Sequence, residues 1–312
     1  MNGGRRKKAI ILDHNRGQLA NQLWNYMSIY AYCLERGYSL ENPSFGDYRE
    51  HFDLYLRKPW TDALFFNAHA KSRLYILLRP YYRYTRMVRR FKNDCAVDSG
   101  QAPHDVVHLP PSHEADALIE KVRRIEKSPC SRIYFCGGRF RNPIGIEKYR
   151  AEIVSYFQPN QKTALLVAAA FHAHRASYDH VVGVHIRQTD FKTDKQGHYV
   201  PPAAFSSVMK KYLELNRHPI SKTLFIICSD EKIDPKDFAG LNVHLNDGTM
   251  GEDLFTLART DAIIGSNSTF GAFAAYYGNI PLMVVGNGPM DWDYYSGKKA
   301  YFENKYCTVV KY

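Results

Sequence analysis

A short apolar run leads into a polar turn at Val181-Val182-Gly183-Val184-His185-Ile186-Arg187-Gln188-Thr189-Asp190. An apolar run of this length between polar residues is typical of a buried strand in a parallel sheet. Open α/β sheets bind ligands beyond the carboxyl ends of such strands. His185, Arg187 and Asp190 therefore fall where a ligand would be held, and arginine suits a phosphate because it donates two parallel hydrogen bonds. An ordinary strand with a charged surface turn explains the stretch equally well.

The residues on either side of this stretch alternate between helical and strand patterns. Helices are predicted at about 163–177, 202–215, 251–259 and 270–277, and strands at 181–186, 223–228, 242–245, 262–265 and 281–285. Alternating strands and helices with short links predict a parallel, doubly wound α/β sheet.

The first half of the chain shows the same pattern less completely. A strand is predicted at 8–14, followed by a glycine-bearing turn and a helix that runs to about Arg36, with Gly37 as its C-cap. That helix has one apolar stripe at helical spacing, made of Leu19, Leu23, Met27, Tyr30 and Leu34. Another strand is predicted at 131–138. We therefore predict two domains, at 1–160 and 161–312.

Composition indicates a folded protein outside the membrane. Of the 312 residues, 45% are hydrophobic and 23% charged, which is ordinary for a globular chain. No apolar run approaches the roughly 20 residues of a membrane span, and the basic N-terminus lacks the apolar core of a signal peptide. We expect a cytoplasmic protein whose six cysteines are reduced.

The net charge of +11 is concentrated in residues 71–92, which hold eight Lys or Arg and no acid. Cations interleaved with aromatic residues suit an anionic membrane surface or a nucleic acid, and a solvated helix face explains them as well. Because the tract also carries leucines and the chain has no nucleic-acid motif, we expect no nucleic-acid partner. We favour peripheral contact with the inner face of a membrane.

Polar side chains follow three strands of the second half. The three groups are His185, Arg187 and Asp190, then Ser229 and Asp230, and then Asn267, Ser268 and Thr269. Right-handed crossovers place all three groups on one edge of the sheet. A guanidinium, hydroxyls and a helix N-terminus would hold a pyrophosphate, while Asp230 or Asp253 could accept hydrogen bonds from a base or a ribose. Helix capping explains each turn separately, but their convergence predicts a nucleotide-diphosphate pocket.

Four segments resemble, in order and spacing, motifs of the GDP-fucose-dependent fucosyltransferases of the α1,2-, α1,6- and protein-O branch. They are 17–23, 185–190, 225–230 and 253–270, and they frame nearly the whole chain. The resemblance implies a GT-B architecture, with two Rossmann-like domains, parallel sheets and an interdomain cleft. It also implies inverting transfer of fucose or a related sugar from a GDP-sugar to a glycan hydroxyl, without a metal ion or a cofactor.

The resemblance further implies roles for individual residues. Arg187 would hold the donor β-phosphate, Asp253 would contact guanine, and Asn21 would close over the donor. The full predicted donor-binding set is Asn21, His185, Arg187, Ser229, Asp230, Asp253, Asn267, Ser268, Thr269 and Phe270. Two positions depart from the family pattern: Gln188 stands where many members have a second arginine, and Gln18 stands where glycine is commoner. Both leave open another GDP-sugar or an altered acceptor.

The acceptor hydroxyl needs a general base, and a carboxylate within hydrogen-bond reach would serve. Asp190 and Asp194 are favoured over Asp13 and His14, although Asp190 could equally brace its own turn. The predicted catalytic set is therefore Arg187, Asp190 and Asp194.

Three alternatives remain at this point. Asp291-Trp292-Asp293 fits the DxD pattern of metal-dependent glycosyltransferases, but it lies beyond the last predicted strand. The chain could also bind a GDP-sugar without catalysis, or be a basic protein that binds RNA or a membrane surface.

Overall fold

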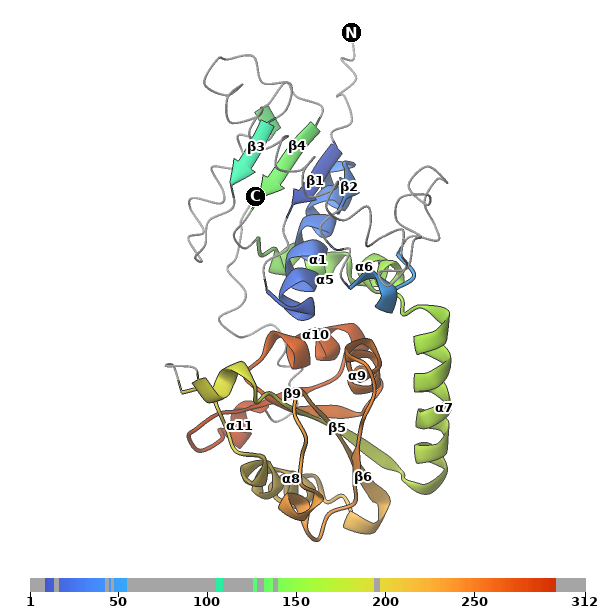
Figure 1. Cartoon of the computed structure of the whole chain (residues 1–312), viewed down its shortest axis with the longest axis vertical. Helices are drawn as coiled ribbons and strands as arrows, with labels where there is room; N and C mark the ends of the chain where they lie inside the picture. Colours follow the sequence, from blue (N-terminus) through green and yellow to red (C-terminus); the bar gives the residue numbers. More distant parts are fainter. Residues whose placement is uncertain are drawn as a thin grey trace. The chain divides into compact units, whose positions relative to one another are not determined.

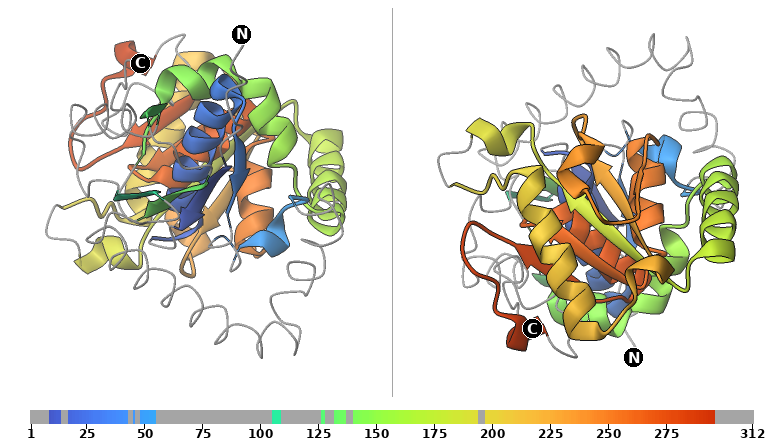
Figure 2. Two further views of the ribbon diagram at one scale, coloured as in Figure 1. Left: turned by 90° about the horizontal axis from the view of Figure 1, so that it is seen from above. Right: turned by 90° about the horizontal axis from the view of Figure 1, so that it is seen from below.

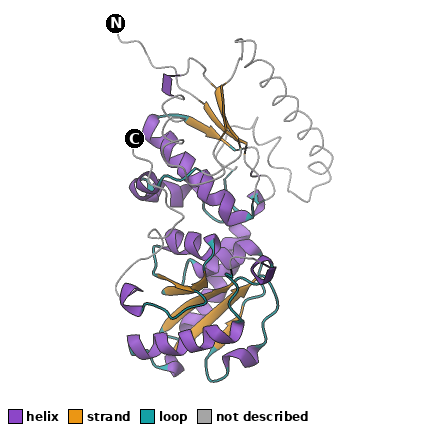
Figure 3. Ribbon diagram, turned by 90° about the vertical axis from the view of Figure 1, so that its left-hand side faces the viewer, coloured by secondary structure: helices purple, strands orange, loops and turns teal. Residues whose placement is uncertain are grey.

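The computed structural model describes residues 9–13, 17–42, 45, 48–54, 105–108, 126–127, 132–136, 140–193 and 197–295. They fall into two units that divide between Gln158 and Pro159 (Figure 1). Each unit combines a parallel sheet with helices, which Figure 3 separates by colour. No described helix has both the length and the apolar character needed to cross a membrane. The basic tract 71–92 lies outside the described residues.

The sheet of the first unit has the strand order β2-β1-β4-β3 and is parallel throughout. Its strands are β1 (Ala9–Asp13), β2 (Ser39–Glu41), β3 (Asp105–His108) and β4 (Arg132–Cys136). The strands predicted at 8–14 and 131–138 are confirmed as β1 and β4. The other two strands, β2 and β3, are not among the predictions.

Helix α1 (Leu19–Arg36) follows β1 and ends at Gly37, whose φ of 65° is the left-handed cap conformation that glycine adopts most easily. The predicted single stripe is too narrow, because α1 is buried around most of its circumference as far as Cys33. The shorter helices α5 (Pro143–Lys148) and α6 (Arg150–Tyr156) pack against α1. Their contacts explain why α1 is covered on more than one side.

The sheet of the second unit has the order β7-β6-β5-β8-β9 and is also parallel throughout. Its strands are β5 (His180–Ile186), β6 (Thr223–Ser229), β7 (Val243–Leu245), β8 (Ala262–Ser266) and β9 (Leu282–Val285). The accompanying helices are α7 (Gln161–Ser177), α8 (Pro202–Asn216), α9 (Met250–Leu257), α10 (Thr269–Gly278) and α11 (Trp292–Tyr295). Every strand and helix predicted in this half is present, and α11 is an addition. The doubly wound sheet is confirmed.

Helices cover both faces of the second sheet. Val182 and Val184 of β5 pack in one core with side chains of α8, and the right panel of Figure 2 shows α8 crossing the strands. Helices α7, α9 and α10 contact the strands from the other face. A Cβ at Gly183 would lie 2.7 Å from Cδ2 of Leu257. Glycine at this position therefore lets α9 approach the strand closely.

The strand order of the second sheet changes direction beside β5. From β5 the chain runs to β6 and β7 on one side, and it then returns to β8 and β9 on the other side. The carboxyl ends of β5 and β8 flank this switch point. In open α/β sheets that is the usual position of a ligand crevice.

Candidate functional site

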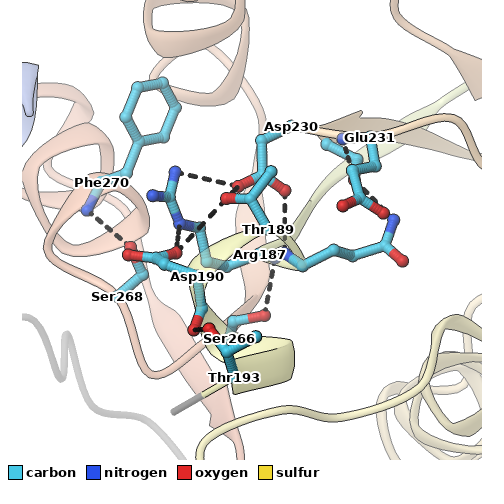
Figure 4. Close-up of polar contacts among 11 residues, drawn as sticks. Arg187, Thr189, Asp190, Thr193, Asp230, Glu231, Ser266, Ser268 and Phe270 are labelled. Carbon is cyan, nitrogen blue, oxygen red and sulfur yellow. Dashed lines mark hydrogen bonds and ion pairs between the residues drawn. The ribbon is translucent and has the colours of Figure 1, made fainter.

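Hydrogen bonds join the carboxyl ends of the three central strands of the second sheet (Figure 4). The peptide N–H of Arg187, after β5, donates to Ser266 Oγ at the end of β8 at 3.0 Å. The next peptide N–H, of Gln188, donates to Asp230 Oδ1 after β6 at 2.8 Å. The convergence predicted from the crossovers is therefore present, and the β5 turn is attached to both neighbouring strands.

The Arg187 guanidinium lies between two carboxylates. Its Nε donates to Asp190 Oδ1 at 2.7 Å, and its Nη1 lies 3.0 Å from Asp230 Oδ2. The side chain is only 14% exposed. One cation thus faces two anions, which hold the guanidinium in a defined orientation at the switch point.

Asp230 organises the β5 turn from the neighbouring strand. Its Oδ2 accepts a second hydrogen bond, from Thr189 Oγ1 at 2.7 Å, while its Oδ1 receives the Gln188 N–H. Both oxygens are therefore used inside the protein. The predicted contact of Asp230 with a base or a ribose would have to share them.

Asp190 is the more exposed of the two carboxylates, at 63% of its side chain against 22% for Asp230. The hydrogen bond from Arg187 lowers the pKa of Asp190 below its usual value. Thr193 Oγ1 also donates to the Asp190 carbonyl oxygen at 3.2 Å. These contacts match the bracing role that the sequence leaves open for Asp190 beside the role of a base.

Gln188 is the residue that stands where many of the fucosyltransferases that the sequence resembles have a second arginine. Its side chain lies against the end of β6. Its side chain is buried, and its Nε2 donates to Ser229 Oγ at 3.2 Å. Ser229 Oγ also accepts the N–H of Glu231 at 3.4 Å, and Glu231 pairs with Lys192. A neutral, internally bonded amide thus stands where a second arginine would add positive charge.

His185 is buried on β5 and stacks on Phe270 of α10, with ring centroids 5.0 Å apart and an interplanar angle of 27°. Burial lowers the pKa of His185 to about 4, and the nearby Arg187 cation acts in the same direction. The imidazole is therefore neutral at pH 7. Its Nδ1 is buried and has no hydrogen-bond partner among the described residues.

Helix α10 begins at this edge of the sheet. Ser268 is its N-cap, and Ser268 Oγ accepts the N–H of Phe270 at 3.2 Å. Asn267 and Thr269 flank the cap, and all four residues are partly exposed. The first turn contains no acidic side chain. The positive end of the helix dipole at the switch point favours an anion.

Asp253 lies in the first turn of α9, whose N-cap Thr249 and Glu252 form a capping box. Asn246 Nδ2 donates to Asp253 Oδ1 at 2.5 Å, and burial raises the pKa of Asp253 to about 7. Asn246 follows β7 directly and is absent from the predictions. A polar residue immediately after a strand, like Asp230 after β6, is the signal that could have identified it.

Asn21 is described in the first unit, in the first turn of α1. Gly17 before it has a φ of +80°, and a Cβ there would lie 2.9 Å from Asn21 Cβ. Gln22 Nε2 donates to the Gly17 carbonyl oxygen at 3.0 Å. The structure thus supports a tight glycine turn before Asn21, and the other predicted donor-binding residues lie in the second unit.

Two predicted residues, Asp194 and His14, lie outside the described residues. Asp291 lies directly before α11, and Asp293 lies within it. Among the residues that the structure describes, no group of three or more His, Cys, Asp or Glu side chains could hold a metal ion.

Comparison by sequence finds no matching family model and no curated relative. Comparison by structure finds fucosyltransferases. A mutant of FUT1 from Arabidopsis thaliana, in complex with GDP, has a TM-score of 0.55 at 14% identity, covering 91% of this chain and 71% of FUT1. The NodZ α-1,6-fucosyltransferase co-crystallised with GDP has a TM-score of 0.52 at 15% identity, covering 90% of this chain and 96% of NodZ.

POFUT1 in complex with GDP-fucose has a TM-score of 0.54 at 10% identity, covering 93% of this chain and 98% of POFUT1. At these identities the likeness concerns the fold. The predicted α/β architecture of the GT-B type is confirmed.

Proposed function

We propose that this protein is a glycosyltransferase that moves fucose, or a related sugar, from a GDP-sugar to a hydroxyl group of a glycan. The observation that carries this proposal is the position of Arg187. It lies at the switch point of a parallel sheet, attached to the strand that leads into the N-terminus of α10. The fold shared with fucosyltransferases that were crystallised with GDP or GDP-fucose supports the choice of donor.

The donor diphosphate would lie between Arg187 and the first turn of α10. A departing diphosphate gains negative charge, which a fixed guanidinium and a helix N-terminus stabilise without reorganising. These groups support a reaction that needs no metal ion. The neutral Gln188 adds no positive charge, so Arg187 carries a large share of this task.

The guanine base would be read at Asp253. A carboxylate can accept hydrogen bonds from two adjacent N–H donors, as on the edge of guanine. Asn246 holds one oxygen of this carboxylate in place. Burial raises the pKa of Asp253 to about 7. N–H donors of a bound base would lower this pKa again, because they stabilise the ionised carboxylate.

For the acceptor we propose an in-line displacement that inverts the anomeric centre. Asp190 and Asp194 are the proposed general bases, one of which would take the proton of the acceptor hydroxyl. Peripheral attachment at the cytoplasmic face of a membrane through residues 71–92 belongs to the same proposal, because it would bring the enzyme to a membrane-bound glycan.

A panel of GDP- and UDP-sugars tests the donor by thermal shift, because a ligand that binds the folded state raises the melting temperature. We expect GDP and GDP-fucose to stabilise the protein and UDP-sugars to leave it unchanged. Release of GDP from GDP-fucose, with or without a glycan, then tests the chemistry. Binding without release would identify a non-catalytic binder, and salt-sensitive RNA binding without GDP binding would favour the basic RNA-binding alternative.

Replacing Arg187 with Ala tests whether the guanidinium at the switch point is needed for transfer. We expect transfer to fall by about a hundredfold or more, the size found when one transition-state donor is removed. Arg259→Ala is the matched control, because Arg259 is an exposed arginine of the same unit that follows α9. Turnover in Arg187→Ala equal to that of the control would overturn the assignment.

A further inference from the structure

Asp190 and Asp230 contact two of the three nitrogens of the Arg187 guanidinium. A bidentate phosphate contact uses either the Nε and Nη2 edge or the Nη1 and Nη2 edge. Asp190 occupies Nε, and Asp230 occupies Nη1. Figure 4 draws no contact from the third nitrogen to the residues shown. Because Nε carries a single N–H, Asp190 uses it fully, whereas Nη1 carries two and keeps one beside its contact with Asp230. A diphosphate can therefore take two parallel hydrogen bonds from the Nε and Nη2 edge only if Asp190 moves away.

The two carboxylates are held with different strength. Asp230 is mostly buried and binds the Gln188 N–H and the Thr189 hydroxyl as well as Arg187. Asp190 is 63% exposed; besides Arg187, its carboxylate contacts, within the described part of the chain, Thr189 Oγ1 at 3.4 Å and its own peptide N–H. An exposed ion pair contributes little to stability and is screened by salt. Asp190 is therefore the carboxylate that can move away from Arg187 with little loss of stability.

We propose that Asp190 and the donor diphosphate compete for the Nε and Nη2 edge of Arg187, and that binding of the diphosphate displaces Asp190. This inference rests on the proposed function and concerns the same site. Asp190 thereby keeps the guanidinium oriented until the diphosphate binds. As a consequence it competes with the ligand, both by holding Nε and by repelling an anion at short range.

The low pKa of Asp190 agrees with a carboxylate that is ionised and paired with Arg187. Once a diphosphate replaces it on Nε, the carboxylate loses its cation and gains an anionic neighbour. Both changes raise its affinity for a proton. Displacement would therefore leave Asp190 better suited to accept a proton than it is in the empty site.

Isothermal titration at fixed ionic strength tests the displacement with two probes, GDP and inorganic pyrophosphate. Asp190→Asn should bind both about two- to fivefold more tightly than the unsubstituted protein, the size expected for an exposed ion pair. Glu231→Gln is the control, because it removes a nearby negative charge that pairs with Lys192 and not with Arg187. Its affinities should stay within about twofold of the unsubstituted protein.

The outcomes separate this inference from the proposed function. Equal or weaker binding by Asp190→Asn, or equal tightening by Glu231→Gln, overturns the displacement while the GDP-sugar function stands. Tighter pyrophosphate binding by Asp190→Asn without any GDP binding supports the displacement and overturns the choice of donor. Failure of both probes to bind the unsubstituted protein overturns both. A crystal structure with pyrophosphate should show a phosphate oxygen on Arg187 Nε, and Asp190 still bound there would contradict us.

Discussion

Ser266 and Arg187 connect the ends of β8 and β5 through one hydrogen bond, from the Arg187 peptide N–H to Ser266 Oγ at 3.0 Å. Ser266 is buried. This bond sets the position of the β5 turn relative to α10, whose N-cap is two residues further along the chain. The relative placement of the guanidinium and the helix N-terminus therefore depends on a serine that need not touch a ligand.

Replacing Ser266 with Ala should lower the free energy of unfolding by about 1–3 kcal/mol, because the Arg187 N–H loses its acceptor in a partly buried place. Urea denaturation measures the effect. Ser221→Ala is the matched control, since Ser221 is exposed and such changes stay within about 0.5 kcal/mol. Equal midpoints for the two variants would show that the bond does not support the turn.

His185 makes stability depend on pH. Its pKa is lowered from 6.5 to about 4 on folding, so the unfolded chain binds the extra proton between these values. The contribution is present above pH 6.5 and is lost as pH falls towards 4, by about 3 kcal/mol. In His185→Phe this dependence should disappear from unfolding measured between pH 7 and 4. A constant difference from the unsubstituted protein across that range would contradict the prediction.

Asp253 acts in the opposite direction over much the same range. Its pKa rises from 3.8 to about 7 on folding, so the folded state binds the extra proton and its contribution is lost as pH rises from 4 to 7. Asp253→Asn keeps an oxygen for Asn246 but does not titrate. The variant should gain stability over the unsubstituted protein as pH rises through this window. Parallel pH profiles for the two proteins would refute the assignment.

Gly278 ends α10 against α9. A Cβ at this position would lie 2.0 Å from the Ala258 carbonyl oxygen, so Gly278→Ala must push the helices apart. We expect a loss of about 1–3 kcal/mol of unfolding free energy. A Cβ at Gly286 would meet nothing within 4 Å, so Gly286→Ala is the control and should stay within about 0.5 kcal/mol. Similar thermal midpoints would show that α10 can shift freely.

Transfer from the GDP-sugar should persist after exhaustive treatment with a chelator. The reason is that Arg187 and the N-terminus of α10 stabilise the departing diphosphate in our proposal. Asp291→Asn with Asp293→Asn should likewise retain activity. Activity that disappears with the chelator and returns with a divalent cation would instead support the DxD alternative.

The three central strands of the second unit could be predicted from their own residues. β5 and β6 are mostly apolar runs of seven residues, and β8 is a shorter one that ends in a polar turn. β2 and β3 have three and four residues, and their strand character comes from pairing with β1 and β4. No local pattern in the sequence reports such pairing.

The candidate site also has features that the sequence predicts and features that it does not. The convergence of three strand ends follows from the topology of a parallel sheet, and Arg187 could be selected because it directly follows a buried strand. The different roles of Asp190 and Asp230 could not be predicted, since both are acids in polar turns after strands. Only packing distinguishes the exposed carboxylate from the mostly buried one.

The sequence by itself determined the doubly wound sheet, the edge at which a ligand would bind and the arginine at that edge. These follow from the period of apolar residues and from the chirality of chain crossings, which are local properties. The tertiary structure alone decided which residues contact the guanidinium and which carboxyl groups are buried. Those properties depend on distances between residues far apart in the chain, and such distances exist only after the sheet has assembled.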